Sequence, residues 1–120
     1  MGALNVRAVG EVHSDDDREF FTFVASGTFV VDGSELSCEV AGKWDERGLP
    51  VVSGDFKITN ERGEELSAGF DGIKDYPGGG AVIDAHVLHG IHSTGAFAQF
   101  PARCACEIRY YEGRLEFSLS

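Results

Sequence analysis

Basic residues are scarce in this sequence, with 10 lysines and arginines against 20 aspartates and glutamates and a formal net charge of −10. Nucleic-acid binding depends on clustered basic side chains that neutralise phosphates, and attraction to anionic lipid surfaces depends on the same side chains. The charge balance therefore predicts no nucleic-acid partner and no membrane partner. Long apolar runs are lacking too, because no stretch approaches the ~20 residues that cross a bilayer and residues 1–19 hold no signal-peptide core. We expect a cytoplasmic protein.

Proline and methionine are also rare, at 3 and 1 residues, whereas 16 glycines indicate many turns and closely packed backbones. This balance favours an all-β domain over a helical bundle. Of the three cysteines, Cys104 and Cys106 lie two positions apart, where a strand places both on one face with poor geometry for a mutual disulfide. We interpret the cysteines as reduced. The length suffices for one hydrophobic core, so residues 1–120 are interpreted as a single domain.

Apolar and polar residues alternate in short segments, which is typical of strands with one buried face. The clearest segment is residues 36–45, and a long segment covers residues 20–32, in which Gly27 would permit a bulge or a bend. The side chains predicted to face inward in these two segments are Phe21, Phe23, Phe29 and Val31 in the first and Leu36, Cys38, Val40 and Trp44 in the second.

Two hairpins are predicted further along the chain, one with its turn at residues 60–63 and one with its turn at Glu112–Gly113. Residues 81–92 are harder to assign, but Gly90 is costly inside a helix and the β-branched residues favour a strand, so we predict a strand. About eight strands without a long helix indicate a closed antiparallel β-barrel, with a small β-sandwich as the alternative. A barrel of this size can enclose one small ligand.

Three histidines recur at three-residue intervals within the segment 81–92 and could suggest zinc or iron. On one strand, however, His86 and His92 would lie about 20 Å apart and His89 would point the opposite way, so we predict no metal site. The strand alternation turns His89 inward with Val87 and Ile91. An inward imidazole needs a hydrogen-bond partner, and we weigh His89 as a structural partner of a buried hydroxyl and as a ligand-contacting or acid–base group.

Several apolar side chains could line an interior cavity for a hydrophobic small molecule, although the same residues could simply pack a core. Cys104 and Cys106 have no adjoining base in sequence, and we interpret them as small hydrophobic residues rather than nucleophiles. The predicted ligand-binding residues are Trp44, Phe56, Phe70, Phe97, Cys104 and Cys106, with Tyr110 and His89 as the candidate catalytic groups.

Residues 91–103 and residues 44–58 carry short motifs that together resemble the superfamily of allene oxide cyclase and dirigent proteins. Residues 91–103, which contain Ser93-Thr94-Gly95-Ala96-Phe97, resemble its small-Thr-Gly-x-Phe/Tyr-x-Gly motif. Residues 44–58 are similar to its Asp-x-x-Gly turn followed by a Gly-x-Phe-x-Ile strand. The same order is seen in bacterial spirotetronate and spirotetramate cyclases, which are small barrels that close a linear polyene by an intramolecular Diels–Alder reaction.

The resemblance implies a cyclase that needs no cofactor, because pericyclic cyclisation requires a dry cavity that orients the substrate and one or two donors to a carbonyl. It implies that His89 or the Tyr110 hydroxyl supplies the donor and that residues 15–19 or 76–80 close the mouth. The alternatives are a non-catalytic carrier of a lipophilic ligand and an interaction module with a solid core. A homodimer is expected if the face formed by Phe20, Thr22 and Val24 is exposed.

Overall fold

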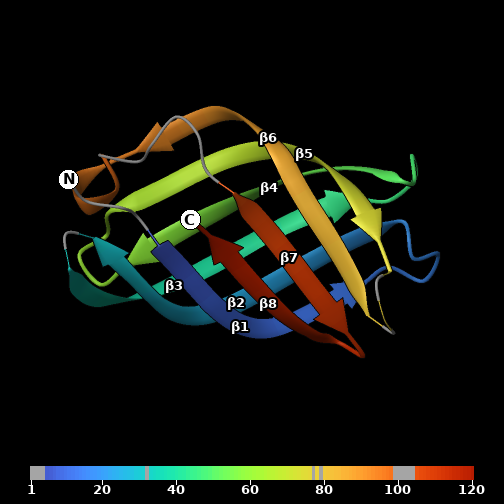
Figure 1. The fold of residues 1–120 in the computed structure, drawn as a ribbon, viewed down its shortest axis with the longest axis horizontal. Helices are drawn as coiled ribbons and strands as arrows, with labels where there is room; N and C mark the ends of the chain where they lie inside the picture. The colour runs from blue at the N-terminus through green and yellow to red at the C-terminus, as the bar shows by residue number, and fades with distance from the viewer. Residues whose placement is uncertain (1–4, 32, 77, 79, 99–104) are drawn as a thin grey trace.

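The computed structural model describes residues 5–31, 33–76, 78, 80–98 and 105–120, with the backbone alone for Val31 and His86. Eight antiparallel strands pair in chain order, and pairing of the last strand with the first closes the barrel seen in Figure 1. The predicted fold class is therefore confirmed. The strands are β1 (Asn5–Ser14), β2 (Phe20–Val31), β3 (Ser34–Asp45), β4 (Val51–Asn60), β5 (Glu65–Asp75), β6 (Ala81–Ser93), β7 (Cys106–Tyr111) and β8 (Arg114–Leu119), with a 3-10 helix η1 (Gly95–Phe97) after β6.

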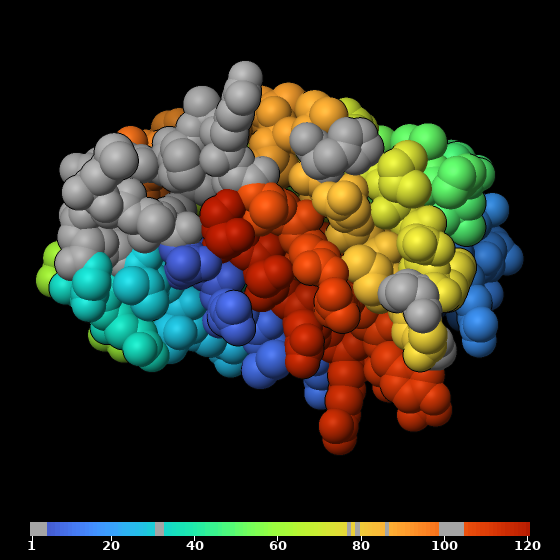
Figure 2. All heavy atoms as spheres, in the orientation of Figure 1, coloured from blue at the N-terminus to red at the C-terminus, as the bar shows by residue number. Residues whose placement is uncertain are grey.

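The predicted hairpins and the strand in residues 81–92 are confirmed. Residues 61–64 connect β4 to β5, one position from the predicted turn. Glu112 and Gly113 connect β7 to β8 with positive φ angles of 49° and 81°. The register of β2 with β1 and with β3 is unbroken at Gly27, so this strand contains no bulge there. Figure 2 shows the β7–β8 hairpin between β1 and β6 on the front face, with its turn projecting from the body of the barrel. The described part of the chain contains no helix with the length and apolar character of a transmembrane span.

Aromatic rings fill much of the barrel interior. Phe56 packs against Phe70 and Phe117 with ring centroids 6.4 and 5.2 Å apart, and these rings are almost fully buried. Inward-facing glycines make room for such rings: a Cβ at Gly42 would lie 2.6 Å from the Phe23 ring. Small residues on the strands and large rings between them therefore build one contiguous core.

One side chain on the predicted inward face of β3 is not buried. Leu36 is 36% exposed, whereas Cys38, Val40 and Trp44 are buried as predicted. The reason lies in the pairing, because β3 meets β4 only from Cys38 onward and its first residues have β2 as their sole neighbouring strand. The β2–β3 hairpin thus extends past the closed part of the barrel.

The predicted inward orientation of His89 is also wrong, since its side chain is 58% exposed. The pairing of β5 with β6 shifts register between Asp71 and Ile73 and again between Ser67 and Gly69. Each β-bulge inserts an unpaired residue and reverses which side chains face the core. Ala81, Ile83 and Ala85 therefore face inward, whereas beyond the first bulge the partly buried position packed on the core is Leu88.

The outer face of β2 carries apolar side chains in contact with solvent. Phe20 and Val24 are 45% and 58% exposed, and Thr22 between them is exposed as well. This meets the condition on which a homodimer was expected, and the assembly itself stays a prediction.

The two ends of the barrel are closed differently. The 3-10 helix η1 lies at the left-hand end in Figure 1. Its Phe97 side chain is fully buried, with its ring centroid 4.7 Å from that of Phe29. At the right-hand end lie the connections β1–β2, β3–β4 and β5–β6. Charged side chains are buried at this second end, and it carries the candidate site.

Candidate functional site

The centre of the site is the carboxylate of Glu46, which is 7% exposed. Its Oε2 atom accepts hydrogen bonds from Trp44 Nε1 at 2.7 Å and from the Tyr110 hydroxyl at 2.6 Å. Its Oε1 atom accepts a hydrogen bond from Lys74 Nζ at 2.5 Å. Both side chains of this ion pair are almost completely withdrawn from solvent, at 4% for Glu46 and 6% for Lys74.

Three strands and one turn bring these groups together. Trp44 and Glu46 are two positions apart, so the inward face of β3 continues into the following turn, where the Glu46 amide donates to the Glu19 carbonyl at 2.7 Å. Lys74 continues the inward positions of β5, and its amide donates to the Pro50 carbonyl at 2.9 Å. Tyr110 follows Cys106 and Ile108 on the inward face of β7. Because alternate side chains of a strand share one face, these site side chains all point into the same end of the barrel interior.

Aromatic rings surround the Lys74 ammonium group. Its Nζ atom lies 5.0 Å from the ring centroid of Tyr76, 5.1 Å from that of Tyr110 and 5.7 Å from that of Phe21. Phe21 also stacks on Trp44, with centroids 5.2 Å apart and planes inclined by 4°. Ring faces stabilise a cation while excluding water, so the ion pair lies in a locally apolar environment.

The electrostatics of the site keep Tyr110 protonated. Burial raises the pKa of the Tyr110 hydroxyl above its ordinary value, and the hydrogen bond to the Glu46 carboxylate raises it further. Ionisation of the phenol would place two negative oxygens in contact, which accounts for the direction. Among the described residues, every buried side-chain nitrogen or oxygen has a hydrogen-bond partner, so this charged cluster is fully satisfied.

A pocket of about 290 Å³ adjoins the cluster from outside. Tyr110 belongs to both, and the pocket runs between the β5–β6 connection and the β7–β8 hairpin. Its other lining residues include Val82 on β6, Leu115 on β8 and the exposed Tyr111. The register pairs Val82 with Arg109 and Arg109 with Glu116, so the pocket lies on the outer face of these strands. The Tyr110 side chain points inward from the same strand to the buried carboxylate.

The structure distributes the predicted site residues over the whole barrel. Trp44 and Tyr110 meet in the cluster, with ring centroids 5.3 Å apart. Phe56 and Phe70 pack in the middle of the core, Phe97 and Cys106 are buried in the core, and Cys104 lies outside the described residues. Of the two segments expected to close the mouth, the β1–β2 connection contributes the Glu19 carbonyl and the β5–β6 connection contributes Tyr76.

His89 lies on the outer surface and does not take part in the cluster. Its ring covers Gly69, where an added Cβ would lie 2.3 Å from the ring, and its Nε2 atom lies 3.6 Å from Asp71 Oδ2. Asp71 also accepts a hydrogen bond from the Ser53 hydroxyl at 2.7 Å. The residues that the structure describes contain no group of three or more His, Cys, Asp or Glu side chains arranged to hold a metal ion.

Glu46 and Lys74 are the site residues that sequence analysis missed. Lys74 stands eight positions after Leu66 on the alternating face of β5, so a charged residue at a core position was visible in the sequence. Glu46 continues the face of Trp44 in the same way. Such residues are rarely fully buried unless they are paired, and an unexpected charge on an inward face is the signal that would have revealed the pair.

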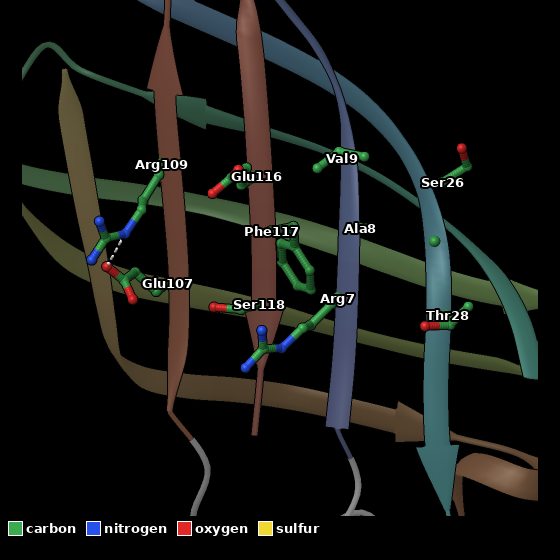
Figure 3. Close-up of a pocket in the computed structure, with 11 residues that line it drawn as sticks. Arg7, Ala8, Val9, Ser26, Thr28, Glu107, Arg109, Glu116, Phe117 and Ser118 are labelled. Atoms are coloured by element: carbon green, nitrogen blue, oxygen red, sulfur yellow. Dashed lines mark hydrogen bonds and ion pairs between the residues drawn. The ribbon is translucent and has the colours of Figure 1, made fainter. Parts of the chain in front are cut away.

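A second concavity, of about 520 Å³, lies on the outer surface of β7, β8, β1 and β2. Figure 3 shows that Glu107 and Arg109 point toward each other, with Arg109 Nε and Glu107 Oε1 2.7 Å apart. Arg7 extends beside Ser118, its register partner on β8. The charged side chains here are exposed, unlike those at the end of the barrel.

Comparisons with known proteins give no relative for this chain. The sequence matches no protein-family model, and neither the curated proteins nor the solved structures gave a match.

Proposed function

We propose that this barrel binds a hydrophobic small molecule that carries a polar group, at the end where Tyr110 covers the Glu46–Lys74 pair. The observation that carries the proposal is the burial of this pair, whose ammonium and carboxylate groups lie 2.5 Å apart beneath aromatic rings. Replacing a buried ion pair with apolar side chains is often neutral or stabilising, so stability alone is a weak reason for its presence. Ionisable groups held in a protected site are typical of binding and catalytic sites.

The surroundings of the pair fit a ligand of this class. The pocket of about 290 Å³ is near the lower limit for small-molecule sites. Its lining combines Val82 and Tyr111 with the charged residues Arg109, Arg114 and Glu116. Tyr76 is 63% exposed, so its ring can move without opening the core, whereas Tyr110 is half-buried and packs on Trp44 and Phe21. The Tyr110 hydroxyl and the Lys74 ammonium group are hydrogen-bond donors suited to a carbonyl or hydroxyl oxygen.

The proposal has a catalytic form, which is the cofactor-independent cyclisation implied by the sequence resemblance. In that form the end pocket orients a polyene, and Tyr110 donates to its carbonyl oxygen. His89 would have no part in it, because its exposed ring covers Gly69 on the outer surface. Return of the bound molecule unchanged would distinguish the carrier from the cyclase.

Trp44 is the single tryptophan of the chain and donates to Glu46, so its emission reports directly on the site. We would titrate the protein with 3-phenylpropanol, an apolar alcohol small enough for the pocket, and follow Trp44 fluorescence. We expect a saturable change at roughly millimolar probe, the affinity that a ligand of this size attains. Val82→Phe fills the pocket and should weaken this response, whereas Val87→Phe places the same ring at an exposed position of β6 outside the pocket and should not.

Equal responses from the two variants, or a linear response without saturation, would contradict the proposal. That result would favour the interaction module with a solid core, for which the rings packed inside the barrel are the specific observation. Circular dichroism of each variant would confirm that the barrel is folded before the comparison is made.

A further inference from the structure

We propose that the ligand of this site is an aldehyde or ketone, which Lys74 captures as an imine; this inference rests on the proposed function. The chain has lysines at positions 43, 57 and 74. Lys43 is exposed, and the Lys57 ammonium group is paired with Glu65 at the surface, where its side chain is 56% exposed. Lys74 alone among them is buried, and it is surrounded by rings. A desolvated lysine beside an acid–base group is a typical carbonyl nucleophile.

Glu46 is placed to control the proton of the amine. Its Oε1 atom accepts a hydrogen bond from Lys74 Nζ at 2.5 Å, so the carboxylate is the nearest base to the amine. In the proposed reaction Glu46 takes one proton from the Lys74 ammonium group, which converts the ion pair into two neutral groups. Glu46 retains the hydrogen bond from Trp44 on its other oxygen throughout, whereas the Tyr110 hydroxyl exchanges Glu46 for the carbonyl oxygen of the ligand.

The reaction balances with the groups that are present. Lys74 gives one proton to Glu46, and the neutral amine attacks the carbonyl carbon to form a carbinolamine. Glu46 protonates the departing hydroxyl group, the C–O bond breaks, and water leaves. The products are a protonated imine on Lys74, one water molecule and the Glu46 carboxylate, so the positive charge stays next to its counter-ion.

The rings around Lys74 determine which carbonyl compounds fit. Phe21, Tyr76 and Tyr110 offer ring faces to the body of the ligand, and the ring face of Tyr110 also stabilises the cationic imine. The Tyr110 hydroxyl, which burial keeps protonated, can donate to the carbonyl oxygen during attack. An aldehyde or ketone with an apolar or aromatic substituent matches these features, whereas an anionic substituent would be repelled by Glu46.

The test compares 3-phenylpropanal with its alcohol, 3-phenylpropanol, which lacks the carbonyl group. The intact protein is incubated with the aldehyde and sodium cyanoborohydride, which delivers hydride to the imine carbon, and modified lysines are mapped by mass spectrometry. We expect Lys74 to be modified about tenfold more than either other lysine, because the site raises the effective concentration of the aldehyde. Lys57→Arg should leave this labelling unchanged, Lys74→Arg should abolish it, and Glu46→Gln should slow it.

Each outcome bears on a different claim. Equal modification of the three lysines, or an unmodified Lys74, would overturn the imine even if 3-phenylpropanol still changes Trp44 fluorescence. Absence of both the adduct and the fluorescence change would overturn the proposed site as well. Because the decisive comparison is made within the wild-type protein, it does not depend on the folding of any variant.

Discussion

The buried ion pair should dominate the stability of its end of the barrel, and Glu46→Gln tests this directly. The carboxylate accepts from three donors, those of Trp44, Tyr110 and Lys74. A glutamine at this position offers one acceptor oxygen and one donor nitrogen, so at least one of the donors would face another donor. The substitution also leaves the ammonium group of Lys74, which is 6% exposed, without its counter-ion.

The expected loss of stability follows from the broken ion pair and the unmatched donors. Breaking a buried pair by removing one partner typically costs about 3–5 kcal/mol, of a total stability of roughly 5–15 kcal/mol. We therefore expect Glu46→Gln to lower the free energy of unfolding by about 3–5 kcal/mol. Adding Lys74→Met removes the unpaired charge, and the double variant should recover about 2–3 kcal/mol of this loss.

Equilibrium unfolding in urea provides the assay, with circular dichroism as the main signal because Trp44 fluorescence will itself change with the substitution. The neighbouring pair of Asp45 and Arg47 is the matched control, since it is also formed beside β3 but lies at the surface with an N–O distance of 2.8 Å. Asp45→Asn should shift the urea midpoint far less than Glu46→Gln. A loss below about 1 kcal/mol for Glu46→Gln, the range of an exposed pair, would refute the reasoning.

Three further predictions concern the rest of the barrel. Stability should decline as pH rises from about 9, because burial and the Glu39 charge raise the pKa of Cys38 from 9.0 to about 11. Between these pH values the folded state holds a proton on Cys38 that the unfolded state releases. Burial raises the pKa of Tyr110 as well, so its ionisation destabilises the fold in the same direction. Urea titrations at a series of alkaline pH values check this, and a flat profile from pH 9 to 11 would contradict it. Phe97→Ala should cost about 3–5 kcal/mol in the same assay because it opens a cavity in the core, and a cost near zero would mean that Phe97 does not close that end. Gly69→Ala should displace the His89 ring, which nuclear magnetic resonance would detect as a shift of the His89 side-chain signals, and unchanged signals would argue against that contact.

Much of the barrel could be predicted from the sequence because strand alternation is a local property. Residues 36–45 and 103–111 showed which side chains face inward, and Trp44 and Tyr110 were both identified in this way. Turn residues such as Glu112–Gly113 located the hairpins, since a positive φ angle leaves few alternatives. Strand alternation and short turns depend on residues that are adjacent in sequence, so they can be predicted without knowing which distant residues come into contact.

The orientation of His89 and the pairing of Glu46 with Lys74 could not be predicted from strand alternation. The bulge on the β5–β6 ladder between Asp71 and Ile73 reversed the orientation of His89, and bulges depend on how two strands are paired. Glu46 and Lys74 are 28 positions apart and meet Tyr110, which lies 64 positions beyond Glu46, only once the barrel is closed. The sequence by itself thus determined an acidic, eight-stranded β-domain with inward-facing Trp44 and Tyr110. The tertiary structure decided that a carboxylate and an ammonium group join them, because closure of the barrel removes these charges from water and makes them pair.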